Sequence, residues 1–175
     1  VRDPIASIEN NVGQTAALLD ALSPHRVPTL IASSSEVYGK RVCDAFCETD
    51  DSLLGPTTAF RWSYACSKAL DEHLALAHHA QHGLPAVVVR LFNTVGPGQV
   101  GDYGMVVPRF VRAALANEPI RVFGTGEQSR CFCDVRDVVE ALIALLRCNP
   151  ARGRVLNVGS DRAITINALA RLVRD

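Results

Sequence analysis

The sequence predicts an α/β fold with a largely parallel sheet, and two patterns support this prediction. Apolar helical stripes alternate with short apolar runs along the whole chain, an order that is typical of β-α-β units. The run AVVVRLFN, residues 86–93, is almost continuously apolar, as expected of a parallel strand that is covered on both faces. Right-handed crossovers would bring the carboxyl ends of such strands, and the loops that follow them, to one edge of the sheet.

The first half of the chain is predicted to contain two helices and two strands. Residues 5–22 form a helix, 29–32 a short strand, and 37–60 a loop rich in Gly, Asp, Pro and Thr. A second helix runs over 63–81, and Gly83-Leu84-Pro85 ends it before the strand at 86–93. The stripe of the first helix is made by Ile5, Ile8, Val12, Leu19 and Leu22.

The second half begins with a glycine-rich loop, GPGQVGDYG, at residues 96–104. A helix over 106–116 follows, and then a short strand, PIRVFG, at 119–124. Residues 134–147 are predicted to form another helix. The run RVLNVGS, residues 154–160, is predicted to be a strand, and Thr165 can cap a last helix over 166–175.

The composition excludes several classes of protein. A chain of 175 residues with 48% hydrophobic content is long and apolar enough to bury a core. Its formal net charge is zero, so it lacks the basic surplus of a nucleic-acid binder. No apolar run approaches the roughly 20 residues that cross a bilayer, and the first ten residues lack the apolar segment of a signal peptide. We therefore predict a cytoplasmic protein with no nucleic-acid or membrane partner.

The cysteines do not predict a metal site. Neither of the two close pairs has the C-x2-C spacing of a zinc knuckle, and no histidine is placed to complete one. Reduced and mostly packed thiols in a cytosolic protein explain them better. The six residues are Cys43, Cys47, Cys66, Cys131, Cys133 and Cys148.

Two polar patterns indicate chemistry. The strand at 29–32 leads directly into Ser33-Ser34-Ser35-Glu36, whose hydroxyls could satisfy turn amides or line a crevice at the carboxyl edge of the sheet. In YACSK, Tyr64 and Lys68 lie four residues apart and share a helix face. An ammonium near a phenol lowers the pKa of the tyrosine and makes it a usable acid or base near neutral pH. The same spacing also occurs by chance in helices with a surface tyrosine and a solvated lysine.

These patterns would meet at one place if the strands are parallel. Ser34 ends one strand, Asn93 ends another, and Tyr64 lies on the helix between them. A hydroxyl, a proton-transfer group and an amide around one crevice form a plausible active site.

Seven segments, taken in order, resemble the NAD-dependent epimerase/dehydratase family, which are extended short-chain dehydrogenase/reductases acting on nucleotide sugars. The segments are NNVGQTAALLDA, ASSSEVYG, YACSK, VVVRLFNTVGPGQ, VPRFV, GTGEQSRCFCDVRDVVEAL and LNVGS. The resemblance implies a Rossmann-like sheet, NAD as cofactor, a nucleotide sugar (a UDP-sugar) as substrate, and a homodimer formed through the helices at 5–22 and 63–81. It also implies that residues 1–95 are the second half of the NAD-binding domain. Residues 96–175 would then be mostly substrate-binding, with one strand returning to the main sheet.

The resemblance assigns the oxidation chemistry to residues of the first half. Tyr64 would take the proton from the sugar C4 hydroxyl as hydride passes to NAD. Lys68 would hold the nicotinamide ribose and bias Tyr64 toward phenolate, and Ser34 would hydrogen-bond the C4 oxygen. The other expected contacts of the cofactor are Asn11, Ser33 and Phe92.

The resemblance assigns substrate binding mainly to the second half. Asn93 would reach the sugar diphosphate. Arg130, with Gln128 close before it, would pair with the same group, since a planar guanidinium suits phosphate oxygens. The alternative for Arg130 is a surface salt bridge. The nucleoside base would lie against Val106, Val122 and Phe123.

Glu36 is the residue that distinguishes between reactions. The Ser-Ser-Glu arrangement resembles UDP-glucuronate decarboxylases and GDP-mannose 4,6-dehydratases, whereas simple 4-epimerases usually carry a small or hydroxyl residue in place of Glu36. SRCFCDVRD also resembles the decarboxylases. Glucose 4,6-dehydratases carry an Asp where this chain has Ser35. We therefore predict a decarboxylase-like enzyme in which Glu36 is catalytic, with UDP-glucose 4-epimerase as the alternative. Glu36 could also be a loop or helix-cap carboxylate.

A non-catalytic reading also remains open. NAD-sensing scaffolds of this superfamily work without turnover, but they generally lack the tyrosine or the lysine, and this chain has both. Both ends of the chain are expected to be cut, with the family's glycine-rich loop, first strand and NAD-ribose acid upstream of Val1 and part of the substrate domain beyond Asp175. We therefore expect residues 1–175 alone to be an inactive fragment that binds NAD weakly.

Overall fold

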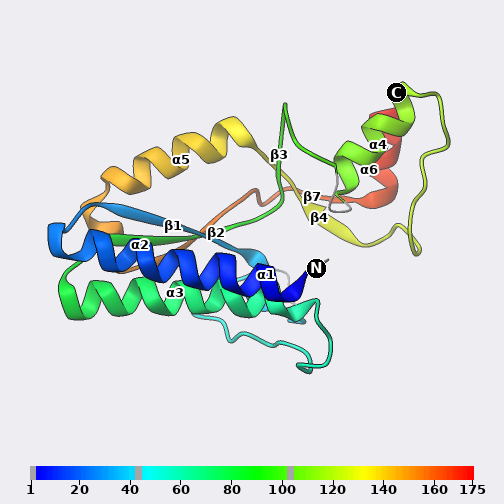
Figure 1. The fold of residues 1–175 in the computed structure, drawn as a ribbon. Coiled ribbons are helices and arrows are strands. Elements are labelled where there is room, and N and C mark those ends of the chain that lie inside the picture. The colour runs from blue at the N-terminus through cyan, green and yellow to red at the C-terminus, as the bar shows by residue number, and fades with distance from the viewer. Residues whose placement is uncertain (1–2, 42–44, 102–104) are drawn as a thin grey trace. The chain divides into compact units, whose positions relative to one another are not determined.

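The computed structural model describes residues 3–41, 45–101 and 105–175 (Figure 1). The chain divides into two compact units. Unit 1 consists of Val1–Leu91 and Glu140–Val158, and unit 2 consists of Phe92–Val139 and Gly159–Asp175. The chain therefore leaves unit 1 after its second strand and returns to it along a helix.

Unit 1 is built on a three-stranded parallel sheet with the strand order β1-β2-β6. The strands are β1 (Thr29–Ser34), β2 (Ala86–Leu91) and β6 (Val155–Val158). Ser34 pairs with Leu91 and Leu91 pairs with Val158, so the carboxyl ends of all three strands lie at one edge. These findings confirm the α/β class and the parallel sheet.

The central strand β2 explains why unit 1 has a core on each face of the sheet. Successive side chains of a strand point to opposite faces. Ala86 and Val88 accordingly belong to one buried cluster and Val87 and Val89 to another. Burial of a valine side chain stabilises a fold by about 1.5–3 kcal/mol, which is why the continuous apolar run of β2 requires helices on both sides.

Helices cover the two faces of this sheet as separate layers (Figure 1). On one face lie α1 (Pro4–Ile8), α2 (Gln14–Leu22) and α3 (Trp62–His82). On the other face lies α5 (Val135–Arg147), whose Leu142 and Leu145 pack against the cluster that contains Val87 and Val89. Three short 3-10 helices complete the connections: η2 (Ser23–His25), η3 (Ser35–Tyr38) and η4 (Asn149–Ala151).

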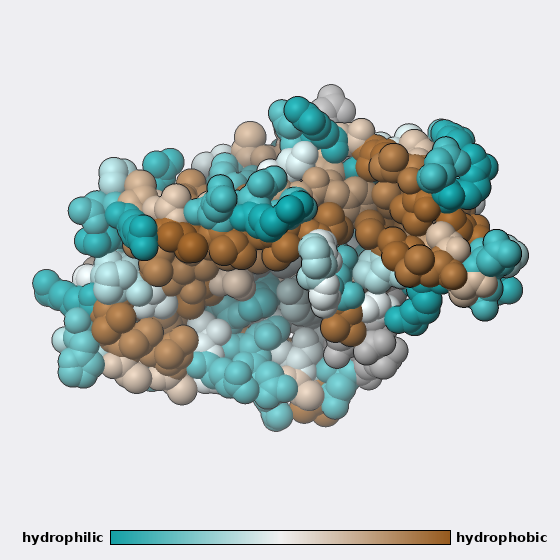
Figure 2. Space-filling model, turned by 90° about the horizontal axis from the view of Figure 1, so that it is seen from above, coloured by the Kyte–Doolittle hydropathy of each residue, from teal (hydrophilic) through white to brown (hydrophobic). Residues whose placement is uncertain are grey.

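Helix α5 is apolar on two sides. The side opposite the sheet carries Val139, Ile143 and Leu146, which are 46%, 47% and 41% exposed. Figure 2 looks down on the molecule from above the view of Figure 1 and shows apolar surface gathered in a band on this face. Asp134 directly precedes the helix and accepts a hydrogen bond from the backbone N–H of Arg136. The Arg136 side chain and backbone hydrogen bonds hold the pKa of Asp134 well below its ordinary value, so this end of the helix keeps a negative charge.

The first predicted helix is continuous but not uniform. Residues 9–13, between α1 and α2, form a π-helical segment, η1 (Glu9–Gly13). Such wide turns are rare and are frequently found at functional sites. The apolar stripe predicted the helix, but it carried no signal for the π segment, because a one-turn bulge changes the spacing of the stripe very little.

The helix at 63–81 ends as predicted. Gly83 has φ of +68° and donates its N–H to the carbonyl of His79. Only glycine adopts this left-handed conformation without a steric penalty. The chain can therefore turn directly from α3 into β2.

A buried ion pair ties α3 to the sheet. The Arg90 guanidinium on β2 donates to both carboxylate oxygens of Glu72 on α3, at 2.9 and 2.7 Å. The Ser33 hydroxyl on β1 donates to the same carboxylate, and the Arg90 guanidinium lies 4.7 Å from the centre of the Tyr38 ring. Burial by itself lowers the pKa of Arg90, but the hydrogen bonds to Glu72 and Tyr38 and the charge of Glu72 raise it above its ordinary value.

The described residues of unit 2 form two small pairs of strands, the helices α4 and α6, and the first turn of α5. Strand β3 (Thr94–Val95) is parallel to β5 (Cys133–Asp134), and β4 (Ser129–Cys131) is antiparallel to β7 (Ala163–Thr165). The helices α4 (Val106–Leu115) and α6 (Ile166–Arg174) pack around Phe110, Ile166 and Leu169. The hydroxyl of Thr165 accepts the backbone N–H of Ala168 at 3.1 Å, which confirms the predicted cap of the last helix.

The predicted strand PIRVFG at 119–124 is wrong, since these residues form an extended loop. Pro119 has no N–H to donate to a ladder, and the carbonyl of Arg121 accepts a hydrogen bond from the Arg109 side chain at 3.2 Å. The true strands of unit 2 were missed because each is only two or three residues long. Among the described residues, no helix is long and apolar enough to cross a bilayer.

We expect Arg90→Met to destabilise unit 1 strongly. The substitution leaves the Glu72 carboxylate buried without its cation, a change that typically costs about 3–5 kcal/mol. The paired substitution Arg90→Met with Glu72→Leu removes both charges and should recover most of this loss. Urea unfolding of the full-length protein, followed by circular dichroism, measures both variants. Equal losses in the single and the paired variant would contradict the role given to the ion pair.

Candidate active site

The Tyr64–Lys68 pair lies in the first two turns of α3, the helix that packs against β1 and η3. The four-residue spacing places both side chains on one side of the helix, and both are half-buried. The structure therefore confirms that YACSK is helical. It also places the pair on the element next to the serine-rich strand end.

Lys68 has an acidic partner that the sequence reading did not include. Its ammonium nitrogen lies 3.1 Å from Oδ2 of Asp71, one turn further along α3. The Lys68 side chain is 17% exposed, and the Asp71 side chain is fully buried. Lys68 is thus held within the helix layer and is not extended into solvent.

The π-helical segment contacts the turn that carries Tyr64. The Asn11 side-chain amide donates to the Ser67 hydroxyl at 2.9 Å. Ser67, which is fully buried, donates in turn to the backbone carbonyl of Tyr64 at 2.9 Å. Asn11 therefore lies close to the catalytic candidates, and its side chain reaches them through Ser67. Its role toward the cofactor stays a prediction.

The serines at the end of β1 differ in their surroundings. Ser33 is buried and donates its proton to Glu72. The Ser34 hydroxyl oxygen accepts the backbone N–H of Glu36 at 3.2 Å and so caps η3. The turn-amide role is therefore real for Ser34, and among the described residues its own proton has no acceptor. Glu36 is exposed at the beginning of η3, close in sequence to the sheet edge where open parallel sheets bind ligands.

In unit 2, the first two residues after β2 are held by local contacts. The Asn93 side-chain amide donates to the carbonyl of Cys131 at 2.9 Å. Phe92 lies against Gly159, where an added Cβ atom would come within 2.8 Å of the Phe92 side chain. Gly159 must therefore remain a glycine for this ring to keep its place. The predicted ligand contacts of Phe92 and Asn93 stay predictions.

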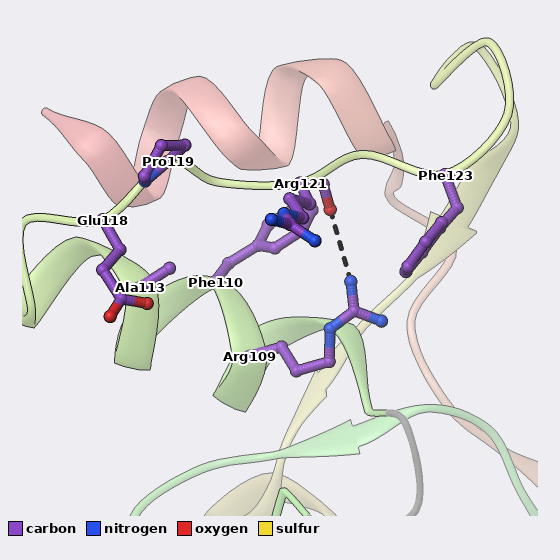
Figure 3. Close-up of a pocket in the computed structure, with 7 residues that line it drawn as sticks. All are labelled: Arg109, Phe110, Ala113, Glu118, Pro119, Arg121 and Phe123. Atoms are coloured by element: carbon purple, nitrogen blue, oxygen red, sulfur yellow. Dashed lines mark hydrogen bonds between the residues drawn. The ribbon is translucent and has the colours of Figure 1, made fainter.

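A cavity of about 530 Å³ lies beside α4 in unit 2. The Arg109 guanidinium carbon lies over the Phe123 ring, 4.7 Å from the ring centre. The same guanidinium donates a hydrogen bond to the backbone carbonyl of Arg121 (Figure 3). Aromatic and guanidinium planes are surfaces on which nucleoside bases stack. The lining residues are Arg109, Phe110, Ala113, Glu118, Pro119, Arg121 and Phe123.

Of the three residues expected to contact the base, only Phe123 lines this cavity. Val106 and Val122 pack against the buried cluster of unit 2 around Phe110. Gln128 donates from its side chain to the carbonyl of Phe123 at 3.0 Å and so supports the loop that carries this ring. Arg130 is exposed, and its guanidinium donates to the carbonyl of Ser129.

The roles of Arg90, Asp71-Glu72 and Arg109 were not predicted from the sequence. The first two are nevertheless indicated by the sequence pattern. Arg90 interrupts an otherwise apolar strand, and Asp71-Glu72 falls on the inward side of an amphipathic helix. A charge at an expected core position indicates a buried partner. Arg109 gave no such signal, because its contact with Phe123 joins residues that are fourteen positions apart.

The donors of unit 1 suit the nicotinamide-ribose part of NAD. An ammonium has three N–H donors, and Asp71 takes one from Lys68. The other N–H donors of the partly exposed Lys68 ammonium can reach ribose hydroxyls. The Tyr64 phenol lies one turn away. The pyrophosphate needs a glycine turn directly between a strand and a helix. Among the described residues, no glycine-rich turn joins a strand directly to a helix.

The structure describes five of the six cysteines. Among the described residues, no group of three or more His, Cys, Asp or Glu side chains is placed to hold a metal ion. Burial and the carboxylates of Asp137 and Asp134 raise the pKa of the Cys133 thiol, which makes it a poor ligand. Cys43 lies outside the described residues. The other cysteines are free thiols, namely Cys47, Cys66, Cys131, Cys133 and Cys148.

Two curated relatives that match nearly the whole chain are named as decarboxylases. UDP-N-acetyl-alpha-D-glucosaminuronate decarboxylase of Bacillus cytotoxicus is 43% identical over 168 residues, which are 95% of this chain and 51% of that protein. UDP-glucuronic acid decarboxylase 3 of Arabidopsis thaliana is 33% identical over 173 residues, covering 99% of this chain and 50% of that protein.

A solved structure is similar over nearly the whole chain. The UDP-N-acetylglucosamine 4-epimerase of Methanobrevibacter ruminantium, in complex with UDP-N-acetylmuramic acid, has a TM-score of 0.88 and 30% identity over 98% of this chain and 54% of its own. The UDP-glucuronic acid 4-epimerase of Bacillus cereus, in complex with UDP-glucuronic acid and NAD, has a TM-score of 0.83 and 27% identity over 95% of this chain and 51% of its own.

The chain spans about half the length of the curated relatives that it matches. The model of one family, described as the NAD dependent epimerase/dehydratase family, matches residues 1–159. That match covers all of unit 1 and residues 92–139 of unit 2. It includes the serine-rich strand end, the Tyr64–Lys68 pair and the buried Arg90–Glu72 pair. The chain belongs to the NAD-dependent epimerase/dehydratase family.

Proposed function

We propose that the full-length protein is an NAD-dependent enzyme that decarboxylates a UDP-linked hexuronic acid through a 4-keto intermediate. The observation that carries this proposal is the 43% identity, over 95% of the chain, to a relative named as a decarboxylase of a UDP-linked uronic acid. The Ser34-Ser35-Glu36 sequence and the intact Tyr64–Lys68 pair support it.

The residues of unit 1 would carry the oxidation at C4. Tyr64 takes the proton of the C4 hydroxyl, and Lys68 lies one turn away on the same side of α3. The Ser34 hydroxyl, whose proton is available, orients the C4 oxygen. Bound NAD would supply the hydride acceptor and return the same hydride at the end, so the turnover is redox-neutral.

The oxidised sugar would lose its carboxylate without a further oxidant. A keto group at C4 makes the C6 carboxylate part of a β-keto acid. The C5–C6 bond breaks, carbon dioxide leaves, and the electron pair moves through C5 onto the C4 oxygen as an enolate. A proton then adds at C5, and hydride returns to C4. Glu36, the acid that follows Ser34, is the candidate for the group acting at the C5–C6 end.

The cavity of unit 2 would bind the nucleotide part of the substrate. The Phe123 ring and the Arg109 guanidinium provide stacking surfaces for a pyrimidine base, and the exposed Arg130 can pair with the diphosphate. Two similar solved structures are named as UDP-sugar 4-epimerases, so epimerisation is the second candidate and the reaction that an experiment must separate. A scaffold without turnover is the weaker alternative, because Tyr64 and Lys68 are both present.

The predicted homodimer and the cytoplasmic location also belong to this proposal. The helices that would form the dimer carry exposed apolar side chains. Ile5, Ile8, Leu18 and Leu70 are 70%, 42%, 49% and 48% exposed. A second copy of the chain would remove this apolar surface from water.

Tyr64→Phe in the full-length protein should lower kcat by about 10²–10⁴-fold, the usual contribution of a positioned acid/base. Affinity for NAD, measured by calorimetry, should change little, because the ring and its packing are retained. Cys66→Ala, two residues along α3, is the matched control and should keep wild-type turnover. Turnover near the wild-type level in Tyr64→Phe would remove this residue from the mechanism.

Glu36→Gln tests the reaction type. The enzyme is given UDP-glucuronate, UDP-N-acetylglucosaminuronate, UDP-glucose and UDP-galactose separately, and carbon dioxide and sugar composition are followed. We expect carbon dioxide release from a UDP-hexuronate, and we expect Glu36→Gln to reduce it by about 10-fold or more. Glu140→Gln, an exposed substitution on α5, is the control and should be silent.

The alternative gives a different pattern in the same assay. Interconversion of UDP-glucose and UDP-galactose without carbon dioxide release, unaffected by Glu36→Gln, would replace the decarboxylase with the 4-epimerase. No conversion of any of these substrates by a folded, NAD-binding protein would favour the scaffold.

Leu70→Glu should convert the expected dimer to a monomer, because it places a charge in the apolar surface of α3. Leu115→Glu, on the 85% exposed Leu115 of α4, should leave the oligomeric state unchanged. Sedimentation equilibrium of both variants measures this. A wild-type protein that sediments as a monomer would refute the dimer.

A further inference from the structure

Asp71 is a fully buried carboxylate whose surroundings differ from those of its neighbour Glu72. Its Oδ2 atom accepts from Lys68 at 3.1 Å, and its Oδ1 atom has no hydrogen-bond partner among the described residues. The Glu72 carboxylate, by contrast, is held at both oxygens by Arg90 and also by Ser33. Buried charges are normally paired and fully hydrogen-bonded. A carboxylate placed only to hold the fold together would be surrounded as Glu72 is.

The position of Asp71 matches that of a group acting on Lys68. Along α3, Tyr64 lies one turn before Lys68 and Asp71 lies one turn after it. Asp71 therefore holds the ammonium from the side away from Tyr64. One of the three ammonium donors is used, and the others remain for a ligand.

Holding Lys68 has a consequence for binding. A lysine has a long flexible side chain. Ordering it costs as much conformational free energy as ordering any of the most flexible side chains. If Lys68 is already ordered in the folded protein, ligand binding does not have to order it again. The affinity for the ligand is then higher. The buried carboxylate also limits the escape of the ammonium into solvent.

We propose that Asp71 is the positioning residue for Lys68: it fixes the ammonium in the free protein, so that Lys68 meets the nicotinamide ribose and biases Tyr64 without further ordering. This inference rests on the proposed NAD-dependent function. It does not make Asp71 a catalytic residue, because its side chain is fully buried and would act only through Lys68.

The test is a double-mutant cycle in the full-length protein. The variants are Asp71→Asn, Lys68→Gln and the two together. Glutamine is chosen in place of Lys68 because it keeps an N–H donor for the buried Asp71 carboxylate and so favours folding. NAD affinity is measured by calorimetry, kcat and KM with the nucleotide sugar by steady-state kinetics, and the unfolding midpoint without NAD by urea titration.

We expect Asp71→Asn to raise the Kd for NAD about 3- to 10-fold, the effect of ordering one long side chain on binding, and to lower kcat. The KM for the nucleotide sugar should stay constant. In the Lys68→Gln background, the same substitution should change the Kd less than about 2-fold, since the residue it acts through is gone. The unfolding midpoint should move little, because the partly exposed Lys68 can turn to water.

Other outcomes overturn the inference. A lower unfolding midpoint with unchanged Kd and kcat would make Asp71 a purely structural residue. Equal effects of Asp71→Asn with and without Lys68 would show that it does not act through this lysine. If the wild-type protein binds NAD and turns over while the cycle shows no coupling, the inference fails and the proposed function stands. If the wild-type protein does not bind NAD, both fail.

Discussion

The buried pair of Arg90 and Glu72 is the interaction on which the rest of unit 1 depends. It joins β2 to α3, and through the Ser33 hydroxyl it also reaches β1. The same guanidinium donates to the backbone carbonyl of Glu48 and lies over the Tyr38 ring, so a long loop is tied to the sheet as well. Because a buried charge is costly without its partner, few alternative placements of α3 keep both groups satisfied. Apolar packing is not directional, whereas the ion pair fixes the position of α3 along the sheet.

That constraint determines where the chemistry of unit 1 lies. The helix held by Glu72 also carries Tyr64 and Lys68 in its first two turns, and the strand held by Ser33 ends at Ser34. A proton-transfer group and a hydroxyl are therefore placed on two elements that the ion pair connects. The π-helical segment adds a further connection, from Asn11 through Ser67 to the backbone of Tyr64. The candidate catalytic residues thus stand on rigid elements, as precise positioning requires.

The two units have different physical characters. Unit 1 has an apolar core on each face of its sheet and places its polar groups in buried, directional contacts. Unit 2 has a single small cluster around Phe110 and short strand pairs, and its cavity is lined by guanidinium and aromatic groups with much exposed surface. Oxidation and proton transfer need fixed distances, whereas recognition of a flat base and a diphosphate needs stacking planes and cations. The proposed function would place oxidation and proton transfer in unit 1 and recognition of the base and diphosphate in unit 2.

The sequence by itself determined the elements that depend on local patterns. The strand β2, the helices with clear stripes, the Gly83 stop and the Thr165 cap all follow from periodicity or from the conformational preference of one residue. The YACSK spacing placed Tyr64 and Lys68 on one helix face for the same reason. What only the tertiary structure decided are contacts between distant segments: Ser33 with Glu72, Asn11 with Ser67, and Arg109 over Phe123. It also decided that PIRVFG is a loop, because a strand needs a partner for its backbone groups, and no local pattern shows where that partner lies.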